Sequence, residues 1–199
     1  MSSSFYPGTS VLINQPGIRD QAELTRYENI VTTYRLAQLQ LGPIPGWFDV
    51  DHLKQIHQHI FQDVYPFAGK IRKENIAKGF FQFAPSQYIE RELDSLLKGL
   101  AKENGLMGKS PDQFADRAAH YMAELNVIHP FREGNGRTQR EFVRTLALNA
   151  GYQLDWSIHN KEDIMRASIR STVDTKDLSN IIRGSIVPRQ REIDRGYDR

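Results

Sequence analysis

Apolar side chains recur every three or four positions through most of the chain, a spacing typical of helices that bury one face. The pattern predicts an all-α bundle with helices at about residues 20–39, 49–64, 90–104, 110–128, 136–151, 161–171 and 176–183. The clearest start signal is at Ser110, which forms a capping-box pattern with Gln113 and precedes Pro111 at the first helical position. The apolar stripe that follows predicts that this helix is buried.

The helical period is interrupted between residues 69 and 85. Extended residues surround Ala77-Lys78-Gly79, and Phe80, Phe81 and Phe83 fall within four positions. Aromatic residues around a turn signal are typical of a β-hairpin and not of a helix. We therefore expect one small hairpin beside the helices, which could simply cover part of the core.

The chain divides into three parts by composition. Residues 1–19 carry turn residues with little periodicity and predict an irregular arm. Residues 20–184 are expected to form one helical domain. Residues 185–199 are expected to form a basic tail, since the run from Arg183 to Arg199 holds five arginines, three acidic residues and few apolar ones. Such a run is typical of a frayed tail, with a docking segment as the alternative.

Composition excludes several classes of site. A chain of 199 residues with 39% hydrophobic content can bury a substantial core. It has no apolar run long enough to span a membrane and no signal-peptide pattern, so a bacterial cytoplasmic location is the default expectation, with delivery into a host cell as the alternative. The absence of cysteine excludes disulfides and thiol catalysis, and a net charge of +2 gives no argument for nucleic-acid binding.

The densest group of chemically active residues runs from His129 to Arg140 and reads HPFREGNGRTQR. Pro130 disfavours helical geometry in the residue before it, so His129 is expected where the preceding helix ends. Phe131 is expected to anchor the following loop in the core, and Arg132 is expected to face solvent. His57, on an apolar helix face, is interpreted as a core histidine and not as a catalyst.

The second half of this stretch has the features of an anion site. Gly134-Asn135-Gly136 tolerates positive φ and lets a backbone approach a ligand, and the helix that follows begins with unpaired N–H groups that attract phosphate. Arg137 and Arg140 share a face of that helix and can contact successive phosphates. Glu133 beside a polyphosphate indicates a bridging Mg²⁺. His129, with an unperturbed pKa near ~6.5, suits a general base.

Each of these features is commonly structural by itself, but their order matches a known signature at every defined position. The stretch resembles the Fic motif, His-x-Phe-x-Asp/Glu-Gly-Asn-Gly-Arg-x-x-Arg. The resemblance continues in Tyr6-Pro7-Gly8-Thr9, in the run from Phe67 to Arg72 and in Ala150-Gly151-Tyr152. It implies a Fic-type helical bundle with a small hairpin and an adenylyltransferase that moves AMP from ATP to a Ser, Thr or Tyr hydroxyl of a target protein.

The resemblance also implies roles for individual residues. His129 corresponds to the general base and Glu133 to the Mg²⁺ ligand. The nucleotide-binding positions are Gly134, Asn135, Gly136, Arg137 and Arg140. The hairpin corresponds to the segment called the flap, which holds the target by adding a strand, at Ala77, Lys78, Gly79, Phe80 and Phe81.

One family pattern is missing. Fic proteins are held inactive by a helix with the pattern Ser/Thr-x-x-x-Glu-Gly/Asn, whose Glu pairs with the second motif arginine, here Arg140. Glu precedes Gly or Asn at four positions, but none has Ser or Thr four residues earlier. This resembles a toxin whose small helical antitoxin supplies the Glu. The alternatives are a nucleotide-binding or partner-docking module without turnover, transfer of another nucleotide-derived group and, more weakly, DNA binding.

Overall fold

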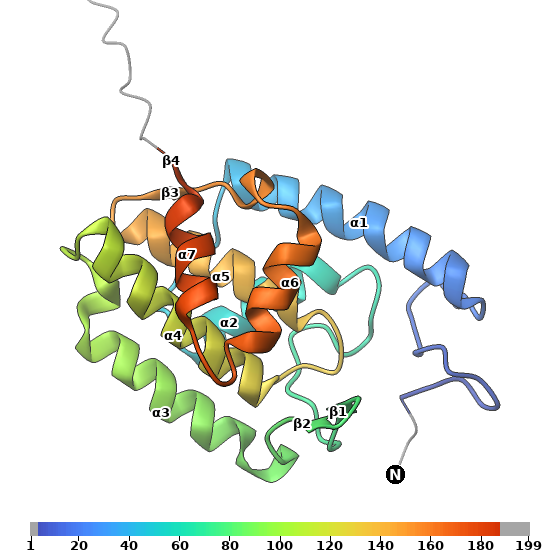
Figure 1. Ribbon diagram of the computed structural model, residues 1–199. Coiled ribbons are helices and arrows are strands. Elements are labelled where there is room, and N and C mark those ends of the chain that lie inside the picture. Colours follow the sequence, from blue (N-terminus) through green and yellow to red (C-terminus); the bar gives the residue numbers. More distant parts are fainter. Residues whose placement is uncertain (1–3, 188–199) are drawn as a thin grey trace, which may run out of the picture.

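The computed structural model describes residues 4–187, and Figure 1 shows a bundle of helices with one small hairpin at its edge. The described residues form seven α-helices, as the apolar spacing predicts. Their bounds are α1 (Gln21–Leu41), α2 (Val50–Phe61), α3 (Ile89–Lys102), α4 (Pro111–Ile128), α5 (Asn135–Asn149), α6 (Lys161–Arg170) and α7 (Lys176–Gly184).

Helix α4 is the centre of the bundle because it packs against α3, α5 and α7. Its capping box is formed, with Ser110 accepting from the Gln113 N–H and the Gln113 side chain accepting from the Ser110 N–H. The predicted apolar stripe is buried throughout, at Phe114, Ala118, Tyr121, Met122, Leu125 and Ile128. Helix α2 packs against both α5 and α1. The site residues therefore lie at the junction of α4 with α5, two helices that pack against each other.

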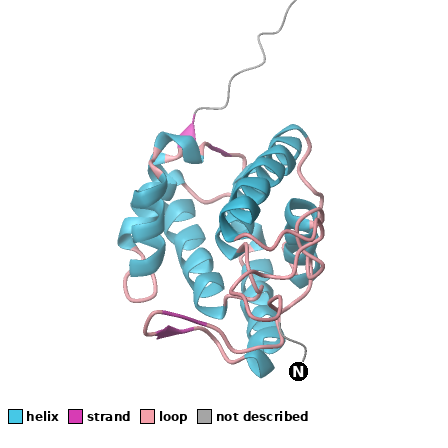
Figure 2. Cartoon of the chain, turned by 90° about the vertical axis from the view of Figure 1, so that its right-hand side faces the viewer, coloured by secondary structure: helices cyan, strands magenta, loops and turns pink. Residues whose placement is uncertain are grey.

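The expected hairpin is present as β1 (Ala77–Lys78) and β2 (Phe81–Gln82), which pair antiparallel. Figure 2 shows this hairpin, drawn in magenta, at the margin of the helical body. A second antiparallel pair, β3 (Gln153–Leu154) with β4 (Ile186–Val187), was not expected from the sequence. It follows α5 and ties the end of the described chain back to the bundle.

The expectation of a frayed tail from Arg183 onward is wrong for its first residues. Arg183 belongs to α7 and its Nε lies 2.7 Å from Oδ1 of Asp112. Ser185 is fully buried and accepts from the Asp155 N–H, and β4 follows it. The remainder of the predicted basic tail, residues 188–199, lies outside the described residues.

The described part of the N-terminal arm lies against the helices. Val11 and Leu12 are buried, and the Gln15 N–H donates to the Val64 carbonyl at 2.8 Å. Tyr34, which lies at helical spacing from the apolar residues of α1, is largely exposed. None of the helices between residues 4 and 187 combines the length and the apolar character that a membrane span requires.

Candidate active site

Helix α4 ends at His129, as the following proline predicts. The His129 N–H still donates to the Leu125 carbonyl at 2.9 Å, but its φ of 49° is left-handed and turns the chain out of the helix. Phe131 is completely buried and stacks on His57 with ring centroids 3.8 Å apart. The turn therefore leaves His129 half-buried at the end of α4, while Phe131, two residues later, is fixed in the core.

The expectation that Arg132 faces solvent is wrong. Its guanidinium carbon lies 4.8 Å from the centre of the Phe5 ring, and its Nε lies 3.3 Å from Oε1 of Glu74. Only 19% of the side chain is exposed. The aromatic ring and the carboxylate both come from segments far away in sequence, so the local pattern could not predict this placement.

His129 is held as a neutral imidazole in one tautomer. Its Nδ1 lies 3.2 Å from the Asn126 carbonyl, which can only accept, so Nδ1 carries the proton and Nε2 keeps its lone pair. The pKa of His129 is lowered to about 4, mainly by burial and in part by the positive charges of Arg72 and Lys78, against the opposing effect of the Asn126 carbonyl. The value near 6.5 expected from sequence is therefore too high, and the ring is unprotonated at neutral pH.

The loop after His129 is fixed by side chains that bind its main chain. Asn135 is buried, accepts from the Phe131 N–H at 2.9 Å and donates to the Phe131 carbonyl at 2.8 Å. His57 accepts from the Gly69 N–H through Nδ1 and therefore donates through Nε2 to the Glu133 carbonyl at 3.0 Å. Burial lowers the pKa of His57 to about 4, which keeps this tautomer. His57 thus acts as a satisfied core histidine.

Gly134 is the one residue of Gly134-Asn135-Gly136 that uses positive φ. Its φ is 84°, and a Cβ at this position would lie 2.3 Å from two carbons of the Phe61 ring. Asn135 and Gly136 already belong to α5. This position therefore requires glycine for two reasons, a left-handed backbone and close packing on a buried ring. Together they allow α5 to begin directly after the loop.

The start of α5 presents unpaired donors beside a positive charge. The first bond of the helix runs from the Thr138 N–H to the Gly134 carbonyl, so the N–H groups of Asn135, Gly136 and Arg137 have no acceptor within residues 4–187. Nη1 of Arg140 lies 3.5 Å from the position that a Cβ on Gly136 would take. The guanidinium of Arg140 thus lies beside the first turn of α5, and a cation close to unpaired N–H groups is an arrangement that an anion fits.

Arg140 has no carboxylate partner among the described residues. Burial lowers the pKa of Arg140, and the neighbouring charge of Arg137 lowers it further. An anion bound here would relieve both effects. Arg140 is therefore the more available of the two motif arginines for a phosphate.

Arg137 is already engaged. Its Nη2 forms an ion pair with Glu28, its Nη1 donates to Thr32 Oγ1 at 3.2 Å, and its guanidinium carbon lies 4.8 Å from the centre of the Phe61 ring. Glu28 could not be assigned to this site from the sequence, because it lies on α1, far from the motif along the chain. A phosphate at Arg137 has to share the guanidinium with this carboxylate.

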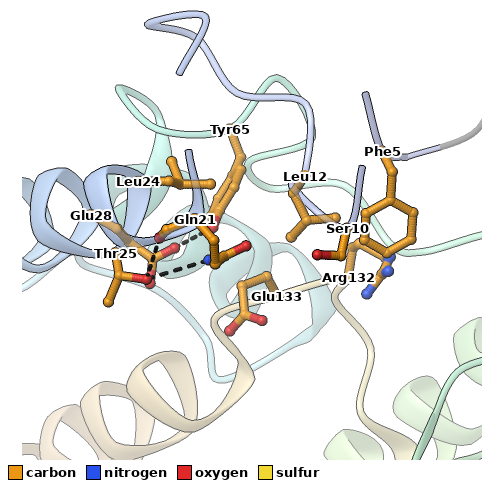
Figure 3. Close-up of a pocket in the computed structure, with 10 residues that line it drawn as sticks. All are labelled: Phe5, Ser10, Leu12, Gln21, Leu24, Thr25, Glu28, Tyr65, Arg132 and Glu133. Carbon is orange, nitrogen blue, oxygen red and sulfur yellow. Dashed lines mark hydrogen bonds between the residues drawn. The ribbon is translucent and has the colours of Figure 1, made fainter. Parts of the chain in front are cut away.

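Glu133 borders a cavity of about 380 Å³ between α1 and the N-terminal arm (Figure 3). Its side chain is 46% exposed, accepts from the Gly134 N–H at 2.8 Å and lies 3.9 Å from Nη2 of Arg137. Glu28 lines the same cavity and accepts a hydrogen bond from the Tyr65 hydroxyl. Burial and this hydrogen bond both raise the pKa of the Tyr65 hydroxyl. Burial is the larger cause. The carboxylates of Glu28 and Glu133 can thus both contact a ligand bound beside the motif.

Glu133 by itself does not form a metal cluster, because the described residues contain no group of three His, Cys, Asp or Glu side chains that could hold an ion. Mg²⁺ in nucleotide sites is usually held by one or two carboxylates together with substrate phosphates and water. A single half-exposed carboxylate fits that requirement when a nucleotide is present.

The hairpin lies over His129. Phe83, just after β2, stacks on the imidazole with ring centroids 3.7 Å apart and an angle of 21°. From the sequence, Phe83 is expected in the hairpin but not at the site. The predicted target-holding positions Ala77, Lys78, Gly79, Phe80 and Phe81 are exposed, with the Phe80 side chain completely so. The structure thus brings an exposed hairpin edge next to a neutral imidazole.

Comparison with known proteins agrees with this geometry. The model of the Fic/DOC family matches residues 47–147. The protein adenylyltransferase VbhT of Bartonella schoenbuchensis is 44% identical over 88% of this chain, which spans 37% of the length of VbhT. An Escherichia coli protein named probable protein adenylyltransferase Fic is 40% identical over 79% of this chain and 78% of its own length.

Solved structures show the same fold. The N-terminal Fic domain of a VirB-translocated Bep effector protein from Bartonella quintana, with bound ADP, superposes with a TM-score of 0.88 at 31% identity and covers 94% of this chain and 95% of its own. BepC from Bartonella tribocorum, with bound AMPPNP, superposes with a TM-score of 0.87 at 29% identity, covering 94% and 97%. The matched motif, the extent of the sequence similarity and the shared architecture show that the chain belongs to the Fic/DOC family.

Proposed function

We propose that this chain is a protein adenylyltransferase that transfers AMP from ATP to a Ser, Thr or Tyr hydroxyl of another protein. The observation that carries the proposal is the pairing of a neutral His129 with the adjacent start of α5: within residues 4–187, Nε2 of His129 and the first N–H groups of α5 have no hydrogen-bond partner. A base without a phosphate site, or a phosphate site without a base, would not support group transfer. Relatives named as protein adenylyltransferases support the same reaction.

The reaction follows from these groups. Nε2 of His129 takes the proton of the target hydroxyl while the hydroxyl oxygen forms a bond to the α-phosphorus of ATP. The bond between that phosphorus and the oxygen of the β-phosphate breaks, so AMP remains on the target and pyrophosphate leaves. The N–H groups of Asn135 and Gly136 and the guanidinium of Arg140 stabilise the charge on the phosphates.

Glu133 is the residue that would hold Mg²⁺ together with the triphosphate. The ion would neutralise charge on the phosphate oxygens and orient them for displacement. Arg137 contributes through a guanidinium whose orientation is set by Glu28 and Thr32. The chain itself thus supplies a base, donors and cations around the reacting phosphorus.

The reaction class is tested with ATP labelled at the α- or the γ-phosphate. The purified chain is incubated with Mg²⁺ and either a bacterial or an animal-cell lysate, since some solved relatives are described as translocated effectors. Label from the α-position on a protein, without label from the γ-position, is the expected result. Label from the γ-position would identify a phosphotransferase. No protein label from either would favour a binding module.

We further propose that a separate small helical protein inhibits this chain through Arg140. Glu28, one of the four glutamates followed by Gly or Asn, pairs with Arg137 and not with Arg140. A carboxylate from a partner with the pattern Ser/Thr-x-x-x-Glu-Gly/Asn would pair with Arg140 and occupy the place of the γ-phosphate. Bacterial growth should stop when the chain is expressed alone and resume when such a partner is co-expressed. Normal growth with an active chain alone would oppose a toxin role.

A further inference from the structure

Arg72 is a buried arginine beside the site, with 4% of the residue exposed. It stands in the segment that leads into β1 and forms no ion pair with any residue between 4 and 187. A guanidinium without a carboxylate is costly to bury unless its N–H groups find acceptors. The acceptors that Arg72 uses are all main-chain carbonyl oxygens.

The Arg72 side chain donates four hydrogen bonds. Nε donates to the His129 carbonyl at 2.7 Å, and Nη2 donates to the Ile128 carbonyl at 3.1 Å. Nη2 also donates to the Ala84 carbonyl at 2.7 Å, and Nη1 donates to the Glu74 carbonyl at 2.7 Å. One planar group thus joins two segments that are separated along the chain.

These four carbonyls fall into two pairs. Those of Ile128 and His129 are at the end of α4, where the last carbonyls of a helix lack partners within it. Those of Glu74 and Ala84 flank the hairpin, one before β1 and one after β2. The guanidinium therefore fastens both ends of the hairpin to the helix end that carries the imidazole.

Two main-chain bonds run alongside this clamp. The Arg72 N–H donates to the Pro130 carbonyl at 2.9 Å, and the Ala84 N–H donates to the Val127 carbonyl at 3.1 Å. Phe83, next to Ala84, carries the ring that stacks on the imidazole of His129. The hold on Ala84 therefore determines where the Phe83 ring sits over the imidazole.

We propose that Arg72 is a positioning residue that locks the hairpin to His129, so that a target strand held on the hairpin edge presents its hydroxyl to Nε2. The delivery of a hydroxyl rests on the proposed function, whereas the lock between hairpin and imidazole does not. A lysine keeps the charge but cannot donate four bonds in fixed directions. Arg72→Lys should therefore release the hairpin without removing the positive charge near His129.

The control variant is Arg144→Lys. Arg144 is equally buried, at 4% exposure, and its guanidinium binds the Glu141 carboxylate and the Leu39 carbonyl inside the bundle. Both substitutions remove a buried fork of donors, so both should lower the urea midpoint of unfolding. Only Arg72→Lys should change the contact between the hairpin and His129.

The lock is measured by NMR of the imidazole of His129 in the full chain. A ring proton that lies over the face of Phe83 is shielded, and Phe83→Leu gives the signal position without that ring. Arg72→Lys should move the His129 signal towards the Phe83→Leu position, while Arg144→Lys leaves it in place. An unmoved signal in folded Arg72→Lys would overturn the proposal, whatever the activity of the chain.

The second readout separates positioning from general damage. Arg72→Lys should lower labelling of the target in a lysate by roughly 10²-fold, the loss expected when reacting groups are displaced by about 1 Å. Binding of AMPPNP, measured by calorimetry, should stay unchanged because no nucleotide-binding residue contacts Arg72. An equal loss of AMPPNP binding would show that Arg72 only supports the fold. If the wild-type chain labels nothing, the proposed function fails while the NMR result still decides the lock.

Discussion

Replacing Gly134 by alanine tests whether the start of α5 is fixed by the conformation and packing of one residue. The φ of 84° is left-handed, which costs an L-residue about 1–2 kcal/mol. The added Cβ would lie 2.3 Å from carbons of the Phe61 ring, and overpacking of this kind costs about 1–3 kcal/mol. Alanine recovers up to about 1 kcal/mol by restricting the unfolded chain. The net loss should be about 1–5 kcal/mol.

Gly136→Ala is the matched control two residues away. Gly136 lies inside the first turn of α5 without positive φ, and its Cβ would be 3.5 Å from the flexible end of Arg140, an ordinary contact. Alanine is favoured over glycine in helices by up to about 1 kcal/mol. Gly136→Ala should therefore keep or raise stability. It should still weaken AMPPNP binding if the phosphate approaches this backbone closely.

Urea unfolding followed by circular dichroism measures both variants. The free energy should fall for Gly134→Ala and not for Gly136→Ala. Combining Gly134→Ala with Phe61→Leu separates the two causes, because the smaller side chain removes the overpacking and leaves the conformational cost. Wild-type stability of Gly134→Ala, or a cost unaffected by Phe61→Leu, would refute this explanation of the loop.

Three further predictions follow from the charges. Burial lowers the pKa values of His57 and His129 from 6.5 to about 4, so between these pH values the unfolded chain binds more protons than the folded chain. The free energy of unfolding should therefore decrease as the pH is lowered from 6.5 towards 4. Equal urea midpoints at pH 7 and about pH 4.5 would contradict this. Glu28→Gln should tighten AMPPNP binding by roughly tenfold by freeing Arg137, whereas weaker binding would show that Glu28 orients the arginine. Glu133→Ala should abolish Mg²⁺-dependent labelling, and Mn²⁺ should partly replace Mg²⁺ in the wild type; labelling that persists in excess chelator would remove Glu133 from its role.

The sequence predicts the helices well because most of their signals are local. The capping box at Ser110 and the apolar spacing that follows it need only neighbouring residues. The end of α4 at His129 follows from the proline beside it. The hairpin is also local, since its turn and aromatic residues lie within a few positions of one another.

What the sequence misses depends on contacts between distant segments. The ion pair of Glu28 with Arg137 and the stacking of Phe83 on His129 join residues from different elements. The low pKa of the imidazole likewise arises from burial, which a motif does not encode. The pairing of β3 with β4 brings together two segments of only two residues each, too short to give a periodic signal.

The most direct test of the central claim compares the wild-type chain with His129→Ala. The claim is that His129 acts as the base while other residues hold the nucleotide. His129→Ala should reduce labelling of the target from α-labelled ATP by roughly 10²- to 10⁴-fold and leave AMPPNP binding intact. Labelling by the variant at close to the wild-type rate would contradict the account.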